Sequence, residues 1–137
     1  MRSGGTPSTG TGPTAAFNGS NYLYCETSGF TNTTFTFDTC TVPLAVLSTG
    51  TLTFELSAIG ATIGTLNVYQ GDGTGVFGAT PIFTQTGPLA GQAQGAVEWS
   101  NQSVLLTIPG TFLDFRFEYV SGSSFTGDLA IDDLRVN

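Results

Sequence analysis

The chain has 137 residues, of which only 9% are charged, and its formal net charge of −7 comes with three arginines and neither lysine nor histidine. Proteins that bind nucleic-acid phosphates use clusters of Lys and Arg, so this composition excludes nucleic acid as a partner and disfavours anionic membranes. Because the apolar runs are too short to span a bilayer, we expect no membrane insertion.

Residues 1–14 are rich in Gly, Ser, Thr and Pro, which predicts a flexible lead-in or an edge segment. Residues 15–137 are long enough for a single domain, and the 11 phenylalanines of the chain suit one buried core. Met1 and Arg2 are followed by Ser-Gly-Gly and not by an apolar segment, so we expect no signal peptide at this end. We therefore expect an internal piece of a larger secreted protein.

The rest of the chain is a series of short apolar segments separated by turns rich in Gly, Pro and Asn. The alternation is cleanest in residues 50–58, where Leu52, Phe54 and Leu56 share one face. No stretch has the apolar spacing of an amphipathic helix. This pattern predicts an all-β sandwich or barrel. The predicted strands are 21–27, 33–39, 50–58, 63–70, 80–86, 95–99, 102–108, 112–120 and 128–136.

The two cysteines, Cys25 and Cys40, lie on either side of a turn near Asn32. If segments 21–27 and 34–41 are neighbouring antiparallel strands, this turn brings the two thiols into disulfide geometry. A disulfide closing a loop of this size would contribute about 3 kcal/mol through the unfolded state. The alternative is a pair of buried thiols.

The last predicted strand contains two adjacent acidic residues, Asp132 and Asp133. Neighbours on a strand face opposite sides, so one carboxylate turns toward the apolar face. An unpaired carboxylate there is costly, which predicts a partner, a bulge or an ion. Hydrogen bonds to backbone amides or a pair with Arg135 are the alternatives to a cation.

Four aromatic residues, Tyr22, Tyr24, Tyr69 and Trp99, are candidates for a ligand-binding platform on which sugar rings stack. Tyr22 and Tyr24 are two residues apart and therefore share a face, which also fits packing in the core. Both interpretations stay open at the level of the sequence.

The chain has few of the residue types that support catalysis. Without His or Lys, Ser-His and Cys-His pairs and Schiff-base chemistry are absent. Paired carboxylates are the remaining option: Asp114 and Glu118 share a face of one strand, and Glu55 or Glu98 could oppose them. The alternative is that all are exposed strand residues. We expect a protein that is not an enzyme.

Several segments in this order resemble a MAM domain, an extracellular β-sandwich module of receptors, adhesion proteins and secreted proteases. The closing segment is GDLAIDDLRV (127–136), and the preceding ones are SGGTPSTGTGP (3–13), NYLYCETSG (21–29), IGTLNVY (63–69) and GQAQGAVEW (91–99). The resemblance covers residues 3–137. Two features depart from the family: its usual first strand has no counterpart, and Ala16, Phe17 and Asn18 replace an Asp-His-Thr.

The resemblance implies an antiparallel jelly-roll β-sandwich that is secreted or at the cell surface. It implies a non-catalytic recognition module with a protein or glycan partner, in adhesion or assembly within a larger protein. The alternative is a carbohydrate-binding module appended to a secreted polysaccharide-degrading enzyme.

Jelly-roll domains often hold a structural Ca²⁺ near their last strand, and oxygen ligands suit that ion. The candidate ligands are Asp132, Asp133, Asp128 and Glu26. The missing first strand also leaves a sheet edge unpaired. We therefore expect either self-association through that edge or a fold-back of residues 3–14 that covers it.

Overall fold

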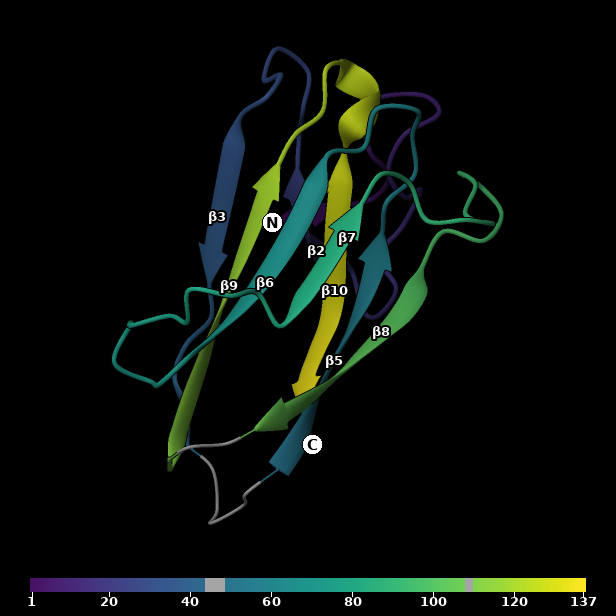
Figure 1. The fold of residues 1–137 in the computed structure, drawn as a ribbon. Helices are drawn as coiled ribbons and strands as arrows, with labels where there is room; N and C mark the ends of the chain where they lie inside the picture. Colours follow the sequence, from purple (N-terminus) through teal and green to yellow (C-terminus); the bar gives the residue numbers. More distant parts are fainter. Residues whose placement is uncertain (44–48, 108–109) are drawn as a thin grey trace.

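The computed structural model describes residues 1–43, 49–107 and 110–137. Two antiparallel sheets face each other and confirm the predicted jelly-roll β-sandwich (Figure 1). The first sheet has the order β1 (Arg2–Ser3), β2 (Asn21–Cys25), β10 (Leu129–Val136), β5 (Thr49–Ser57), β8 (Ser100–Thr107). The second has the order β3 (Thr34–Asp38), β9 (Phe112–Val120), β6 (Thr65–Gly71), β7 (Phe83–Thr86), and β4 (Val42–Pro43) also pairs with β9.

Most predicted strands are confirmed, with one exception. Segment 95–99 is a turn and loop, and β8 begins directly after it at Ser100. The last residue of predicted strand 102–108 lies outside the described residues. A short 3-10 helix, η1 (Phe125–Gly127), precedes β10. In the described part of the chain, no helix is long and apolar enough to cross a membrane.

The core lies between the sheets and follows from period-two alternation. Leu52, Phe54 and Leu56 of β5 are fully buried, as predicted. The Phe54 ring meets Phe83 and Phe117 of the opposite sheet edge-to-face, with ring centroids 5.4 Å apart in both pairs. Each such side chain contributes about 1.5–3 kcal/mol by leaving water, so these contacts fix how the two sheets lie on each other.

The predicted disulfide is wrong, because Cys25 and Cys40 are both free thiols in this structure. The prediction required β2 and β3 to be neighbours. Instead, β2 pairs with β10 and β3 pairs with β9, so the two strands belong to opposite sheets. Cys25 packs against the core, while Cys40 is exposed in the segment after β3.

The N-terminal segment packs against the first sheet. Arg2 and Ser3 pair with Tyr22 and Asn21, so β1 extends the sheet at its β2 edge. Further along, Thr11 is fully buried: its hydroxyl donates to the Ile59 carbonyl at 2.8 Å and accepts from the Asp128 amide at 3.0 Å. This segment therefore has well-defined partners in the fold.

The glutamines of the GQAQG run attach this segment to the sheet. The Gln94 amide nitrogen donates to the Ser8 and Thr11 carbonyls, and its oxygen accepts from the Gly10 amide at 2.6 Å. Gln92 spans the end of β5, since it donates to the Leu56 carbonyl at 2.7 Å and accepts from the Ala58 amide at 2.8 Å. The N-terminal segment thus covers part of the outer face of the first sheet, while the outward residues of β8 stay exposed.

Candidate functional site

The outer face of the second sheet presents a row of polar side chains. Alternation turns Phe35, Phe117 and Leu66 toward the core, so the residues that follow them in sequence point outward. The register then aligns one outward residue from each strand. Across β3, β9, β6 and β7 this row reads Thr36, Glu118, Asn67, Thr84.

A second row lies next to the first and contains the aromatic side chain of Tyr69. Asp38, Arg116 and Tyr69 are aligned across β3, β9 and β6. Arg116 forms a two-pronged ion pair with Asp38, with Nε–Oδ1 at 2.8 Å and the second nitrogen to Oδ2 at 2.7 Å. These hydrogen bonds from Arg116 are the main cause that lowers the pKa of Asp38. The guanidinium also lies over the Phe77 ring, 4.3 Å from its centroid.

The segment that links β6 and β7 forms one wall of the site, and Asp114 of β9 fixes it. Asp114 is only 4% exposed and accepts from the amides of Gly73 at 2.9 Å and Gly75 at 3.2 Å. Gly73 has φ +83°, and a Cβ at Gly71 would collide with the Asp114 carboxylate, so glycine is required at both positions. The GDGTGVFG motif therefore packs tightly against β9.

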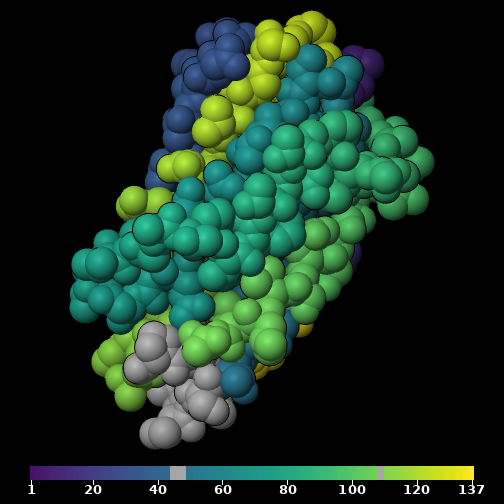
Figure 2. Space-filling model, in the orientation of Figure 1, coloured from purple at the N-terminus to yellow at the C-terminus, as the bar shows by residue number. Residues whose placement is uncertain are grey.

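These parts enclose a hollow of about 310 Å³ on the outer face. Its side chains come from β6, β9 and the β6–β7 segment, namely Tyr69, Phe77, Arg116 and Glu118, with Gly75, Gly78 and Ala79. In Figure 1 the β6–β7 segment crosses in front of β9. In Figure 2 the teal residues of β6 and β7 form the front of the molecule, and no other segment lies over them.

The hydrogen-bonding groups of this face are largely unused. The Thr84 hydroxyl donates to Asn67 Oδ1 at 2.8 Å, which orients the amide so that its nitrogen remains able to donate outward. The Glu118 carboxylate and the Tyr69 hydroxyl have no hydrogen-bond partner among the described residues. The site thus combines an aromatic ring with open donors and acceptors, which suits a ligand rich in hydroxyl groups.

Of the four predicted platform residues, only Tyr69 belongs to this site. Tyr22 is 1% exposed and its hydroxyl donates to the Gly4 carbonyl at 2.8 Å. Its ring packs edge-to-face against Tyr24 and Trp99, with centroids 6.3 and 5.7 Å away. The Trp99 indole N–H donates to the Ala15 carbonyl at 3.1 Å. Tyr22, Tyr24 and Trp99 therefore hold the N-terminal segment on the first sheet and do not join Tyr69.

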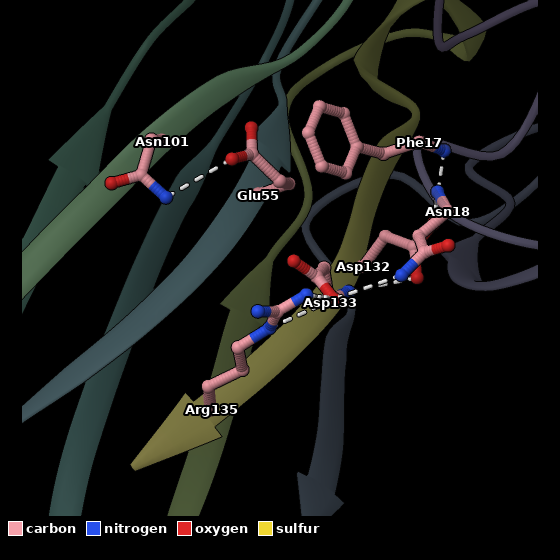
Figure 3. A network of polar contacts seen from close by, with 7 residues as sticks. All are labelled: Phe17, Asn18, Glu55, Asn101, Asp132, Asp133 and Arg135. Carbon is pink, nitrogen blue, oxygen red and sulfur yellow. Dashed lines mark hydrogen bonds and ion pairs between the residues drawn. The ribbon is translucent and has the colours of Figure 1, made fainter. Parts of the chain in front are cut away.

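The predicted metal ligands fall into two separate groups. In the first (Figure 3), Asp132 Oδ2 accepts from the Phe17 amide at 2.9 Å and the Asn18 amide at 3.0 Å. Asp133 has φ +50° within a β-bulge, and its Oδ1 accepts from Arg135 at 2.8 Å. The predicted bulge and the hydrogen-bonded alternative are confirmed, because the bulge lets both carboxylates find partners away from the core.

The second group surrounds Tyr24. Its hydroxyl lies 2.6 Å from Glu26 Oε2 and 2.9 Å from Asp128 Oδ2. Asp128 is fully buried, and the Thr27 amide donates to its Oδ1 at 2.9 Å. Burial raises the pKa of Asp128, against the opposing effect of hydrogen bonds from Thr27 and Tyr24. Among the described residues, no three acidic or other metal-binding side chains come together, so the four predicted ligands do not form one set.

The predicted opposing carboxylates are also separated. Asp114 and Glu118 belong to the second sheet. Glu55 lies on the first sheet, where Asn101 donates to it at 3.0 Å (Figure 3). Glu98 accepts from the Thr14 amide at 2.9 Å. Neither Glu55 nor Glu98 faces the pair on β9, so the option of opposed carboxylates is not realised.

The sequence alone does not mark Asn67, Thr84 or Arg116 as site residues. Alternation with Phe115, Phe117 and Tyr119 already indicates that Arg116 and Glu118 point outward. Nothing local aligns them with Asn67 or Thr84, because that depends on the register between strands distant in sequence.

No family model matches the sequence. The structure is similar to a cleaved adhesin domain of Lys-gingipain from Porphyromonas gingivalis, with a TM-score of 0.68, 18% identity, and coverage of 98% of this chain and 80% of that one. It is also similar to a family 16 carbohydrate-binding module (TM-score 0.59, 16% identity, 92% of this chain and 82% of that one). A third similar structure is the EclA C-terminal domain, a sugar-binding protein (TM-score 0.56, 17% identity, covering 88% of this chain and 79% of that one). At these identities the likeness shows the shared fold.

Proposed function

We propose that this protein is a secreted or cell-surface, non-catalytic module that binds a glycan on the outer face of the β3-β9-β6-β7 sheet. The observation that supports this most directly is the open row of side chains beside Tyr69, where the Glu118 carboxylate and the Asn67 amide nitrogen have no hydrogen-bond partner among the described residues. An uncovered sheet face with unused hydrogen-bonding groups is suited to a polar ligand.

The chemistry of the site fits a sugar chain. A pyranose ring presents C–H groups that pack on an aromatic face such as Tyr69, and its hydroxyls both donate and accept. Two neighbouring hydroxyls can donate to Glu118, and Asn67 can donate back. Strands lie about 4.8 Å apart, so the row across four strands is roughly 14 Å long, which fits an oligosaccharide better than a single ring.

Fold likeness to carbohydrate-binding and sugar-binding domains supports this proposal, though only at the level of architecture. The carboxylates also suit binding better than hydrolysis. Asp114 is occupied by the glycine amides and Glu118 has no second carboxylate opposite it in the described sheet, so no pair is available for acid–base work.

A second candidate is a module for adhesion or assembly with a protein partner. It is favoured by the likeness over nearly the whole chain to the gingipain adhesin domain, and by the resemblance of residues 3–137 to MAM domains. Membership of the MAM family and a structural Ca²⁺ remain predictions under this proposal.

A glycan array probed with the labelled protein tests the proposal. We expect binding to a set of related oligosaccharides, confirmed by titration calorimetry in solution. Absence of any glycan signal, together with concentration-dependent self-association in sedimentation, would support the protein-binding candidate instead.

A further inference from the structure

We infer that this site selects uncharged glycans and rejects acidic ones, because the single cation on its face is already neutralised. The inference rests on the proposed function and names the class of ligand. The chain has three arginines and no lysine or histidine, and Arg2 and Arg135 belong to the first sheet. Arg116 is therefore the cation of this face.

The Asp38 carboxylate is paired with the Arg116 guanidinium. Two nearly parallel hydrogen bonds, at 2.8 and 2.7 Å, match the planar fork of the guanidinium to the carboxylate. Phe77 lies against the guanidinium at 4.3 Å from its ring centroid. This pair uses Nε and one terminal nitrogen, so a uronate or sulfate that approached the remaining guanidinium N–H groups would meet the negative charge of Asp38 at close range.

The sum of the charges around the hollow also favours an uncharged ligand. The Asp38–Arg116 pair sums to zero, and the neighbouring Glu118 adds an uncompensated negative charge to the hollow. The whole chain carries −7, so the long-range field also repels anions. The pair is partly exposed, with side chains 37% and 42% accessible, so its effect is on selectivity more than on stability.

Hydrogen-bond chemistry points to the ligand that is accepted. The ionised Glu118 carboxylate can only accept hydrogen bonds, so its ligand must supply the donors. Sugar hydroxyls, which neutral and acidic glycans share, supply donors, whereas the carboxylates and sulfates that distinguish acidic glycans supply none and are repelled. The face thus favours neutral hexose or pentose chains, whose hydroxyls pair with Glu118, Asn67 and Thr36.

The test compares neutral and acidic chains of equal length. Cellohexaose, xylohexaose, mannohexaose and hexagalacturonate are titrated into the wild type and into Asp38→Asn at low and high salt. In the wild type we expect binding to at least one neutral hexasaccharide and at least tenfold weaker binding to hexagalacturonate. Asp38→Asn releases the Arg116 fork, so the ratio of acidic to neutral affinity should rise at least tenfold and fall again with salt.

Asp133→Asn is the matched control. Asp133 forms the other ion pair, with Arg135 at 2.8 Å, but it lies on the first sheet. This variant makes the same change in net charge and also releases an arginine. Because that arginine lies away from the proposed site, the ratio of acidic to neutral affinity should stay within twofold of the wild type.

The outcomes separate the two claims. Wild-type protein that binds hexagalacturonate as tightly as its best neutral ligand would overturn the selectivity and leave glycan binding intact. An unchanged ratio in Asp38→Asn, or an equal rise in Asp133→Asn, would overturn the role of the Asp38–Arg116 pair. Failure to bind any glycan on a full array would overturn the proposed function and this inference with it.

Discussion

At the scale of single residues, Tyr24 offers one hydroxyl proton to two carboxylates. Its oxygen is 2.6 Å from Glu26 and 2.9 Å from Asp128, and a hydroxyl donates one hydrogen bond at a time. Burial acts to raise the pKa of Glu26 as well, but hydrogen bonds from Ser28 and Tyr24 outweigh it and lower that pKa overall. The pKa of Asp128 is raised, so Asp128 is the carboxyl that holds a proton most readily.

The linkage between this proton and folding has a definite sign. Because the pKa of Asp128 is raised by folding, its contribution to stability is fully present below the ordinary carboxyl pKa and is lost as pH rises through the raised value. Asp128→Asn mimics the protonated form, since its amide can donate to Tyr24 while its oxygen accepts from the Thr27 amide. We expect this variant to be at least as stable as the wild type at pH 7. Its free energy of unfolding should also depend less on pH.

Asp128→Ala provides the contrast. It leaves the buried Thr27 amide without its acceptor, which should cost about 1–3 kcal/mol. Urea denaturation of both variants between pH 4 and 8 measures these differences. Equal stability of Asp128→Ala and the wild type at every pH would contradict the role given to this carboxyl.

The two thiols should react at very different rates. Burial raises the pKa of Cys25 to about 12, so little thiolate is present at neutral pH, whereas Cys40 is exposed. We expect a thiol reagent to label one cysteine of the native protein within minutes and both after denaturation without reductant. Cys40→Ser should remove the fast phase and Cys25→Ser should not. No free thiol in the denatured, unreduced protein would show that a disulfide forms after all.

At the scale of elements, the sequence predicts strands better than it predicts their neighbours. Strands β5 and β9 follow from period-two alternation, and their large inward side chains are buried as expected. The disulfide prediction failed because strands adjacent in sequence usually pair, whereas this fold sends β2 and β3 to opposite sheets. The row from Thr36 to Thr84 likewise depends on register, which local patterns do not specify.

Segment 95–99 shows a related limit. Val97 and Trp99 alternate with polar residues as they would in a strand, but Gly95 has φ +78° and Trp99 packs on the N-terminal segment. Tertiary contacts with residues far away in the sequence therefore decide its conformation.

The β6–β7 segment offers a test at this scale. Asp114→Ala leaves the Gly73 and Gly75 amides without their acceptor, so the wall of the site should loosen and stability should fall by about 1–3 kcal/mol. Hydrogen exchange at residues 73 and 75 should become faster than in the wild type. Asp72→Ala is the control, because the Asp72 carboxylate accepts from the amide and hydroxyl of Thr74 within the same turn, and Asp72 does not link the segment to β9 among the described residues. Unchanged exchange in Asp114→Ala would contradict the anchoring role.

At the scale of the whole molecule, the two outer faces of the sandwich differ. The first is partly covered: Phe17 and Asn18 bond to Asp132, and Tyr22 is buried beneath the N-terminal segment, while the outward residues of β8 stay exposed. The second carries a polar face with a hollow beside Tyr69, and in Figure 2 the residues of β6 and β7 lie uncovered at the front of the molecule. Under the proposed function, recognition therefore belongs to the second sheet, and the aromatic cluster on the first sheet holds the N-terminal segment in place.

The most direct test of this assignment is calorimetric titration of the best neutral ligand into the wild type, Tyr69→Phe and Tyr69→Ala. Tyr69→Phe keeps the aromatic face and should bind within about threefold of the wild type. Tyr69→Ala removes it and should bind at least about tenfold more weakly, which corresponds to about 1.4 kcal/mol, while thermal unfolding shows that it remains folded. Tyr69→Ala that binds as tightly as the wild type would place the ligand elsewhere and contradict the account.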